Sequence, residues 1–173
     1  MATSNTMAVL ASALGISILS SASTPAMEED HTTVMAAKLV EGEKAADTLV
    51  DSIQAGRTLA DVVDERSFAN AATTLHAIGG STNAVIHLPA IAEGFDVPFT
   101  PEDIRRKANT PVLLNLMPTG KYVMVDLYEQ AGGLPPFAKY LIEAGLLDAS
   151  AQTVTGESLG DLLADVDTPT FAD

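Results

Sequence analysis

Glycines divide this chain of 173 residues into stretches whose apolar side chains recur at the spacing of a helix. The apolar pattern of Met7–Leu14 is followed by Gly15, at the position where helices commonly end. A second helical pattern runs over Glu65–Ile78 and stops at Gly79-Gly80. Since glycine adopts a left-handed backbone without strain, this pattern predicts short helices joined by tight turns.

Further helices are expected along the rest of the chain. Glu28–Ala55 is expected to form one helix, or two with a kink at Gly42, and Gly56 suits its C-cap. Thr100–Asp103 resembles a helix start, because a cap residue precedes a proline and two carboxylates. One further helix is expected to begin at Ser81 or Thr82, with a kink or split at Pro89. The other three are expected from Tyr122 to Gln130 before Gly132-Gly133, from Pro135 or Pro136 to Gly145, and from Ser158 to Ala164.

Strands are rare in the pattern. Val112–Leu116 is a short apolar run between prolines and predicts a buried strand, and Ala151–Val154 is a candidate for a second one. A single strand makes no sheet. Either the domain is all-helical with one extended segment, or its other strands lie outside this chain.

The apolar run at residues 7–19 has the outline of a signal peptide, but no Lys or Arg precedes it. It is also too short to span a bilayer. We therefore expect a buried helix, capped by Ser4 or Thr6, with Met7, Leu10 and Leu14 on one face.

Charge and cysteine content restrict the function. With 23 acidic and 9 basic residues the net charge is −14, which argues against nucleic acid and anionic membranes as partners. The chain has no cysteine. This excludes disulfides, thiolate nucleophiles, cysteine-ligated zinc and a self-contained cysteine-ligated iron–sulfur cluster.

The most suggestive local motif is GGSTNA at residues 79–84. Two glycines allow close approach of a ligand to the backbone, and the N-terminus of the next helix favours a carboxylate or phosphate. Ser81, Thr82 and Asn83 add side-chain donors. The alternative is an ordinary turn, in which glycines end one helix and Ser or Thr caps the next.

Other motifs are weaker. Thr119-Gly120-Lys121 lacks the spacing of a phosphate loop and is best interpreted as a turn. The adjacent side chains of Glu28–His31 cannot converge on one metal from a helix, so we interpret them as a charged first turn. His76 and His87 flank the diglycine and are either pocket residues or packed, hydrogen-bonded ones. No Ser/His/Asp arrangement is supported.

Taken in order, four segments resemble the dihydroxy-acid dehydratase / phosphogluconate dehydratase family, which includes sugar-acid dehydratases. They are SNTMAVLASALGISI (4–18), AIGGSTNAVIHLPAIA (77–92), TPVLLNLMPTGKYVMVDLYEQAGGLP (110–135) and LIEAGLLDASAQTVTGESLGDLL (141–163). The second is the most distinctive. By similarity alone, IGGSTNAVIHL and PTGKYVMVDLYEQAGGLP are nearer the sugar-acid branch than the branched-chain amino-acid branch.

The resemblance implies an α/β N-terminal domain with a parallel sheet, followed by a β-rich C-terminal domain. It implies a hydro-lyase that converts a 2,3-dihydroxy acid or sugar acid to a 2-keto acid. In such an enzyme an iron–sulfur cluster acts on the departing hydroxyl, Mg²⁺ grips the substrate, and a serine alkoxide removes the α-proton. None of the family's cysteines, Mg²⁺ ligands or this serine maps to a position here. Only two expectations carry over to residues of this chain. They are a pocket-lining role for Gly80, Ser81, Thr82 and Asn83, and a place beside the cluster for Met1–Asn5.

We therefore expect a helix-dominated α/β fold over residues 1–173, a partial N-terminal domain that is incomplete at both ends. Most of the sheet and the C-terminal domain are then absent. By itself this internal fragment should be inactive and bind neither cluster nor metal. The complete protein is expected to be a cytoplasmic homo-oligomer acting on a small hydroxy acid, without nucleic acid or membrane. The alternatives are a non-enzymatic helical module, which would fold cooperatively alone, and a secreted protein cleaved near Met27. A fragment would expose apolar surface instead.

Overall fold

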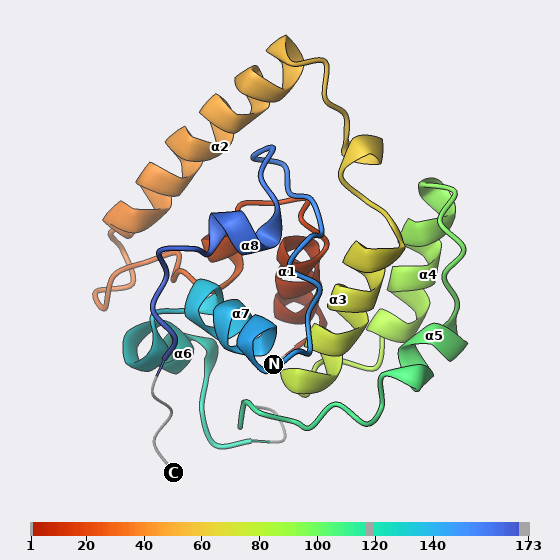
Figure 1. Ribbon diagram of the computed structural model, residues 1–173. Helices are drawn as coiled ribbons and strands as arrows, with labels where there is room; N and C mark the ends of the chain where they lie inside the picture. Colours follow the sequence, from red (N-terminus) through yellow and green to blue (C-terminus); the bar gives the residue numbers. More distant parts are fainter. Residues whose placement is uncertain (1, 117–119, 170–173) are drawn as a thin grey trace.

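The computed structural model describes residues 2–116 and 120–169, and helices dominate this part of the chain (Figure 1). The helices are α1 (Thr3–Ala13), α2 (Ala36–Gln54), α3 (Glu65–Ala77), α4 (Ala84–Gly94), α5 (Pro101–Arg106), α6 (Met124–Ala131), α7 (Leu134–Glu143) and α8 (Leu159–Leu162), with 3-10 turns η1 (Leu19–Ala22) and η2 (Leu59–Asp61). Within the described ranges no β-strand forms, and the β-pairing consists of isolated bridges. The helix-dominated part of the expected fold class is confirmed. The parallel sheet stays a prediction about longer family members.

Helix α1 lies at the centre of the fold, between two groups of helices (Figure 1). Val9 belongs to a core built around α7, whereas Leu10 and Leu14 belong to a second core built around α3 and α4. All three side chains are almost completely buried. The prediction of a buried helix at the N-terminus is therefore confirmed. The expected caps are wrong, because Ala2 precedes the helix without a side-chain cap bond.

Two glycines that were expected to end helices do so in a left-handed conformation. Gly15 has φ +79° and Gly79 has φ +59°, directly after α1 and α3. A side chain at Gly15 would also collide with the backbone, since its Cβ would lie 2.3 Å from the carbonyl oxygen of Gln152. Gly15 is therefore both a helix stop and a point of close approach between distant segments.

The helix expected from Glu28 begins eight residues late, at Ala36. The Asp30 carboxylate accepts hydrogen bonds from the backbone N–H groups of Thr32 and Thr33 and from the Thr33 hydroxyl. Such local bonds compete with helix formation. They also hold the pKa of Asp30 far below its usual value, the Thr33 hydroxyl contributing most. The interpretation of Glu28–His31 as a first helical turn is therefore wrong, and α2 continues through Gly42 as one helix.

Both expected strands are wrong. In Val112–Leu116 only Leu116 makes a β-bridge, to Tyr122. The N–H groups of Leu113 and Leu114 instead donate to the carbonyl of Ala77. This carbonyl lies at the end of α3, where helix carbonyls lack partners in their own helix. The segment therefore closes a helix terminus, while Leu114 and Leu116 fill the core.

The second strand candidate, Ala151–Val154, makes one bridge between Gln152 and Ser158. Its Val154 N–H donates to the carbonyl of Gly15, so this segment binds the turn that follows α1. The Thr100 start is confirmed, with the Asp103 carboxylate accepting from the N–H and hydroxyl of Thr100.

Three other helix boundaries differ slightly from expectation. Helix α4 runs through Pro89 without splitting, and its N-cap is Asn83 rather than Ser81 or Thr82. Helix α6 begins two residues after Tyr122, and α7 begins one residue before Pro135. Such shifts of one or two residues are common at helix ends. None of the helices in the described ranges is both long and apolar enough to cross a membrane.

Helix α2 is attached to the rest of the protein mainly by polar contacts. The Glu41 carboxylate accepts from the hydroxyls of Ser20 and Thr24, both at 2.6 Å, and pairs with Lys38 at 2.9 Å. Near the other end of the helix, the Ser52 hydroxyl donates to the carbonyl of Val154. No residue of α2 is fully buried. The orientation of α2 thus depends on Glu41 more than on apolar packing.

The contacts of Glu41 also change the pKa of its carboxyl group. Partial burial acts to raise the pKa, but the hydrogen bonds from Ser20, Thr24 and Lys38 outweigh it and lower the pKa below its ordinary value. A carboxyl group whose pKa is lowered by folding stabilises the protein above its unfolded pKa, near ~4.3 for Glu. That stabilisation is lost as the pH falls through the folded pKa.

We predict that Glu41→Gln destabilises the fold at pH 7 by about 1–2 kcal/mol, because the charged acceptor is lost. The difference from the unmodified chain should shrink as the pH falls below the unfolded pKa of Glu, ~4.3, and through the lower folded pKa of Glu41. Urea unfolding, followed by circular dichroism at several pH values, measures the free energy of unfolding of both chains. Glu43→Gln, at an exposed position of the same helix, is the control. Equal losses for the two variants at pH 7 would contradict the anchoring role of Glu41.

Candidate functional site

The turn between α3 and α4 holds the residues expected to line a pocket. The N–H of Gly79 donates to the carbonyl of His76, and that of Gly80 donates to the carbonyl of Leu75, which closes the end of α3. A Cβ at Gly80 would lie 2.7 Å from Cδ1 of Leu75 and 2.9 Å from Cγ2 of Thr6. The turn therefore packs closely against α1 at Gly80, and a larger residue there would displace the side chains of Leu75 and Thr6.

The N-terminus of α1 meets this turn through three hydrogen bonds. The Ser81 N–H donates to Oγ1 of Thr6 at 3.0 Å, and the hydroxyls of Thr3 and Ser81 lie 3.0 Å apart. The Asn83 side-chain amide donates to Oγ1 of Thr3 at 2.8 Å. Two segments about 80 residues apart, which the resemblance assigns to the same region, are thus side by side. We call Thr3, Thr6, Ser81 and Asn83 the hydroxyl–amide cluster.

The residues of the hydroxyl–amide cluster and the neighbouring Thr82 differ in burial. Thr6 is completely buried, Thr3 and Ser81 are half-buried, and Thr82 and Asn83 are exposed. A small polar ligand can reach the side chains of Thr82 and Asn83 from solvent. Hydroxyl and amide groups can bind a hydroxy acid by hydrogen bonds, but they supply no strong acid, base or nucleophile by themselves.

The histidines do not join this cluster. His76 Nε2 lies 3.0 Å from the carbonyl oxygen of Ile104, so His76 is a packed, hydrogen-bonded residue. His87 is exposed on α4. Lys121 lies over the ring of Tyr122, with 5.0 Å between Nζ and the ring centroid, whereas Thr119 lies outside the described residues. These observations agree with the structural interpretation of His76 and with an ordinary turn at Gly120-Lys121.

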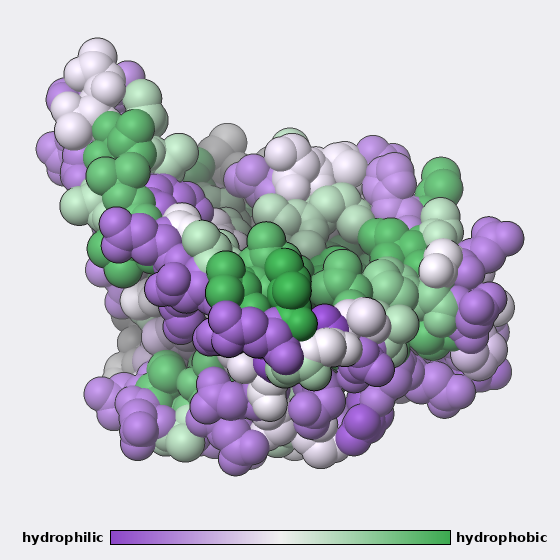
Figure 2. Space-filling view, turned by 90° about the horizontal axis from the view of Figure 1, so that it is seen from above, coloured by the Kyte–Doolittle hydropathy of each residue, from purple (hydrophilic) through white to green (hydrophobic). Residues whose placement is uncertain are grey.

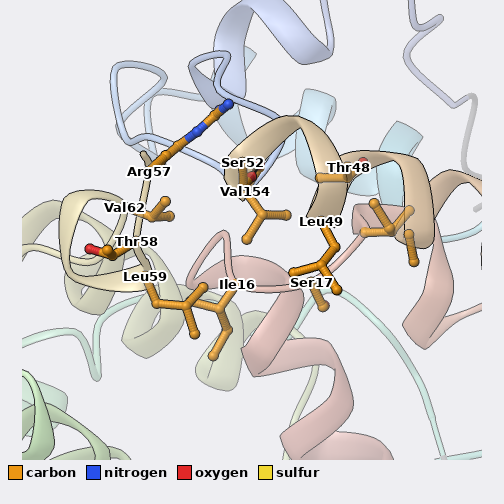
Figure 3. A pocket seen from close by; sticks show the side chains of 12 residues that line it. Ile16, Ser17, Thr48, Leu49, Ser52, Arg57, Thr58, Leu59, Val62 and Val154 are labelled. Carbon is orange, nitrogen blue, oxygen red and sulfur yellow. Dashed lines mark hydrogen bonds between the residues drawn. The ribbon is translucent and has the colours of Figure 1, made fainter. Parts of the chain in front are cut away.

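A separate cavity of about 400 Å³ lies between α2 and the segment immediately after α1 (Figure 3). Its apolar lining includes Ile16, Leu49 and Leu59, and Figure 3 shows these side chains pointing toward one another from different segments. The Arg57 side chain extends beside the backbone of Gly156. Periodicity in the sequence gave no sign of this cavity, because its lining comes from residues 16–18, 45–62 and 154, which are distant in the chain.

The residues of this chain do not fit the cofactors that the resemblance implies. An iron–sulfur cluster needs thiolate ligands, and the chain contains no cysteine. Magnesium prefers carboxylate oxygens, but across residues 2–116 and 120–169 no three His, Asp or Glu side chains converge as a metal site. Neither group is therefore assigned to residues of this chain.

Comparisons with known proteins identify the family of this chain. Residues 1–162 match the family described as dihydroxy-acid/6-phosphogluconate dehydratase N-terminal. The chain belongs to this dehydratase family.

Its relatives include proteins named dihydroxy-acid dehydratase. The protein of Chloroflexus aggregans is 41% identical over 167 residues, which are 96% of this chain and 28% of the relative. Those of Synechococcus sp. (strain CC9902) and Albidiferax ferrireducens are 41% and 42% identical, over 100% and 96% of this chain and 30% and 28% of the relatives. The chain thus spans less than a third of the length of these relatives.

We predict that Thr6→Val, which keeps the side-chain shape, destabilises the chain by about 1–3 kcal/mol because it leaves the partly buried Ser81 N–H without its acceptor. Urea unfolding measures the loss, and hydrogen exchange at the Ser81 amide should accelerate. Thr82→Val changes an exposed side chain and serves as the control. If both variants unfold at the same urea concentration, Thr6 does not hold the turn.

Proposed function

We propose that this chain supplies the N-terminal part of a hydro-lyase that converts a 2,3-dihydroxy acid or a sugar acid to a 2-keto acid. The observation that carries this proposal is the family match over residues 1–162. The relatives named dihydroxy-acid dehydratase support the same reaction class. The hydroxyl–amide cluster adds a place where the most distinctive family segment lies against the start of α1.

Within such an enzyme, Gly80, Ser81, Thr82 and Asn83 line the substrate pocket, and Met1–Asn5 lies beside the iron–sulfur cluster. Asn83 and Thr82 are the exposed members and so can reach the substrate directly. Thr6 and Gly80 act through the backbone, by fixing the turn against α1. Proton abstraction and departure of the hydroxyl need stronger groups than these. They require residues, an iron–sulfur cluster and Mg²⁺ that this chain alone does not hold.

The working protein is, in this proposal, a cytoplasmic homo-oligomer whose partner is a small hydroxy acid. The net charge of −14 supports the exclusion of nucleic acid and anionic membranes, since both repel an acidic surface. The choice between a branched-chain dihydroxy acid and a sugar acid is a matter for substrate assays.

A second candidate is a non-enzymatic helical module derived from the dehydratase. It is favoured by the packing of the described residues. In the described part of the chain two apolar cores are formed, and no buried side-chain nitrogen or oxygen lacks a hydrogen-bond partner. A module of this kind would unfold in one cooperative transition and stay monodisperse without a further polypeptide.

We predict that the isolated chain converts neither a branched-chain 2,3-dihydroxy acid nor an aldonic acid to a 2-keto acid. After anaerobic incubation with iron and sulfide it should retain no iron and show no cluster absorbance in the visible range, because it lacks thiolate ligands. Iron analysis and a 2-keto acid assay measure these outcomes. Stoichiometric cluster binding, or turnover of either acid, would contradict the prediction.

A chimera tests whether this chain supports the dehydratase reaction when the rest of the enzyme is present. In the Chloroflexus aggregans relative, this chain replaces the 167 matching residues, so that the relative supplies the remaining parts. We expect cluster absorbance and conversion of at least one of the two acids. Asn83→Ala in the chimera should lower kcat/KM at least about tenfold through loss of a binding contact, at unchanged absorbance. Ile86→Ala, at an exposed position on α4, is the control. A chimera that loads its cluster and converts neither acid refutes the assignment.

A further inference from the structure

The cavity between α2 and the segment after α1 is separate from the hydroxyl–amide cluster, since none of the four cluster residues lines it. Its volume of about 400 Å³ lies within the range of about 300–1,000 Å³ that small-molecule sites occupy. In Figure 1, α2 runs along the upper edge of the molecule. Figure 2 looks down on this edge and shows hydrophobic residues gathered among hydrophilic ones. The cavity is therefore a candidate for a second ligand.

The walls of the cavity are apolar side chains that remain open to solvent. The exposed fraction is 61% for Leu49 on α2 and 45% for Leu59 on η2. Figure 3 shows that both side chains point toward each other and toward Ile16. Removing apolar surface from water is favourable, and a concave wall can be covered by a small body. The walls therefore favour a ligand with an apolar part.

A positive charge without a carboxylate partner also lines the cavity. The chain has four arginines, and three of them form ion pairs: Arg66 with Asp64, Arg105 with Glu102, and Arg106 with Asp103. The fourth, Arg57, is half-buried, and its guanidinium has no hydrogen bond or ion pair within residues 2–116 and 120–169. A guanidinium binds a carboxylate through two parallel hydrogen bonds. Arg57 is thus suited to an anionic group of a ligand.

Gly156 leaves room for this guanidinium at the edge of another segment. A Cβ at Gly156 would collide with Nη1 of Arg57 and would lie 2.7 Å from its Cζ. The carboxylates closest in sequence, Asp61 and Glu157, instead accept hydrogen bonds from hydroxyls of threonines near them. Packing against Gly156 therefore holds Arg57 in place, while its N–H donors stay available.

The size of the cavity indicates which kind of ligand fits. A helix with its side chains is about 10–12 Å wide and rises about 5.4 Å per turn, so one turn fills about 400–600 Å³. The cavity is too small for two helical turns, whether from a second polypeptide or from the rest of a longer dehydratase. An apolar cavity of about 150 Å³ holds benzene, so this larger one has room for roughly 10–16 non-hydrogen atoms.

We propose that this cavity binds an amphipathic monocarboxylate, of the class of fatty acids with about 8–12 carbons. The apolar chain of the ligand lies between Ile16, Leu49 and Leu59, and its carboxylate pairs with Arg57. Both chemical features of the cavity, the open apolar wall and the unpaired guanidinium, are then satisfied by one molecule. The site concerns the chain by itself and does not depend on the proposed dehydratase function.

Calorimetric titration of the complete chain with decanoate tests the site. We expect one saturable site with a dissociation constant on the order of 10–100 µM. Decanol has the same apolar chain without the charge. Arg57→Gln should weaken decanoate binding at least tenfold and change decanol binding less than twofold, because only decanoate loses a charge partner. Arg105→Gln, at an exposed position on α5, is the control and should alter neither affinity.

A second pair of variants tests whether the ligand lies inside the cavity. Ala45 and Ala46 are neighbouring exposed residues of α2, and of these two only Ala45 lines the cavity. Ala45→Phe places a ring in the cavity and should abolish binding of both decanoate and decanol. Ala46→Phe adds the same ring outside it and should leave both affinities unchanged. Circular dichroism verifies that both variants are folded.

Three results with the isolated chain would overturn the proposal. The first is the absence of saturable decanoate binding. The second is decanoate affinity that Arg57→Gln leaves unchanged, or that Arg105→Gln lowers equally, since the guanidinium of Arg57 would then not bind the carboxylate. The third is decanoate binding that survives Ala45→Phe, which would place the ligand elsewhere.

The dehydratase chimera extends the titration to the assembled enzyme. We expect the chimera to bind decanoate with the affinity of the isolated chain. Loss of binding there would show that the remaining part of the relative fills the cavity, and would overturn the site. The heat of binding is measured without turnover. A chimera that binds decanoate but converts neither acid refutes only the dehydratase assignment, so the two proposals fail separately.

Discussion

The described fold depends on the burial of α1 on two sides. Neighbouring residues on a helix point about 100° apart, so Val9 and Leu10 enter different cores, and α1 joins them. A helix of 11 residues has little stability by itself, so this packing is what maintains it. Its first turn is thereby fixed in space, and Thr3 and Thr6 are presented to the α3–α4 turn. The geometry of the candidate site is thus a consequence of the core.

Local signals in the sequence predicted the helices well. The stops at Gly15 and Gly79 are governed by the backbone freedom of glycine, a property that does not depend on the rest of the fold. The Thr100 start depends only on residues within one helical turn. The failure at Glu28 is also local, since the bonds to the Asp30 side chain stabilise a turn that charge pattern alone does not reveal.

The features that the sequence did not predict involve partners that are distant in the chain. Val112–Leu116 has the composition of a strand, but strand formation needs a neighbouring strand, and here the amides find the end of α3 instead. The glycines and hydroxyl groups of residues 79–83 were identified from the motif. That Thr6 would accept from Ser81, rather than cap its own helix, depends on how α1 packs. Periodicity carries no information about such contacts.

Helix α2 has the apolar pattern of a packed helix but lacks the burial itself. In most globular proteins an amphipathic helix is stabilised by packing of its apolar face. Here a helix of 19 residues without a fully buried side chain depends on the Glu41 contacts at one end and the Ser52 contact near the other. Covering the exposed side chains of Leu39, Val50 and Ile53 would add the missing apolar term, so the binding of any cover is coupled to the stability of α2 by mass action.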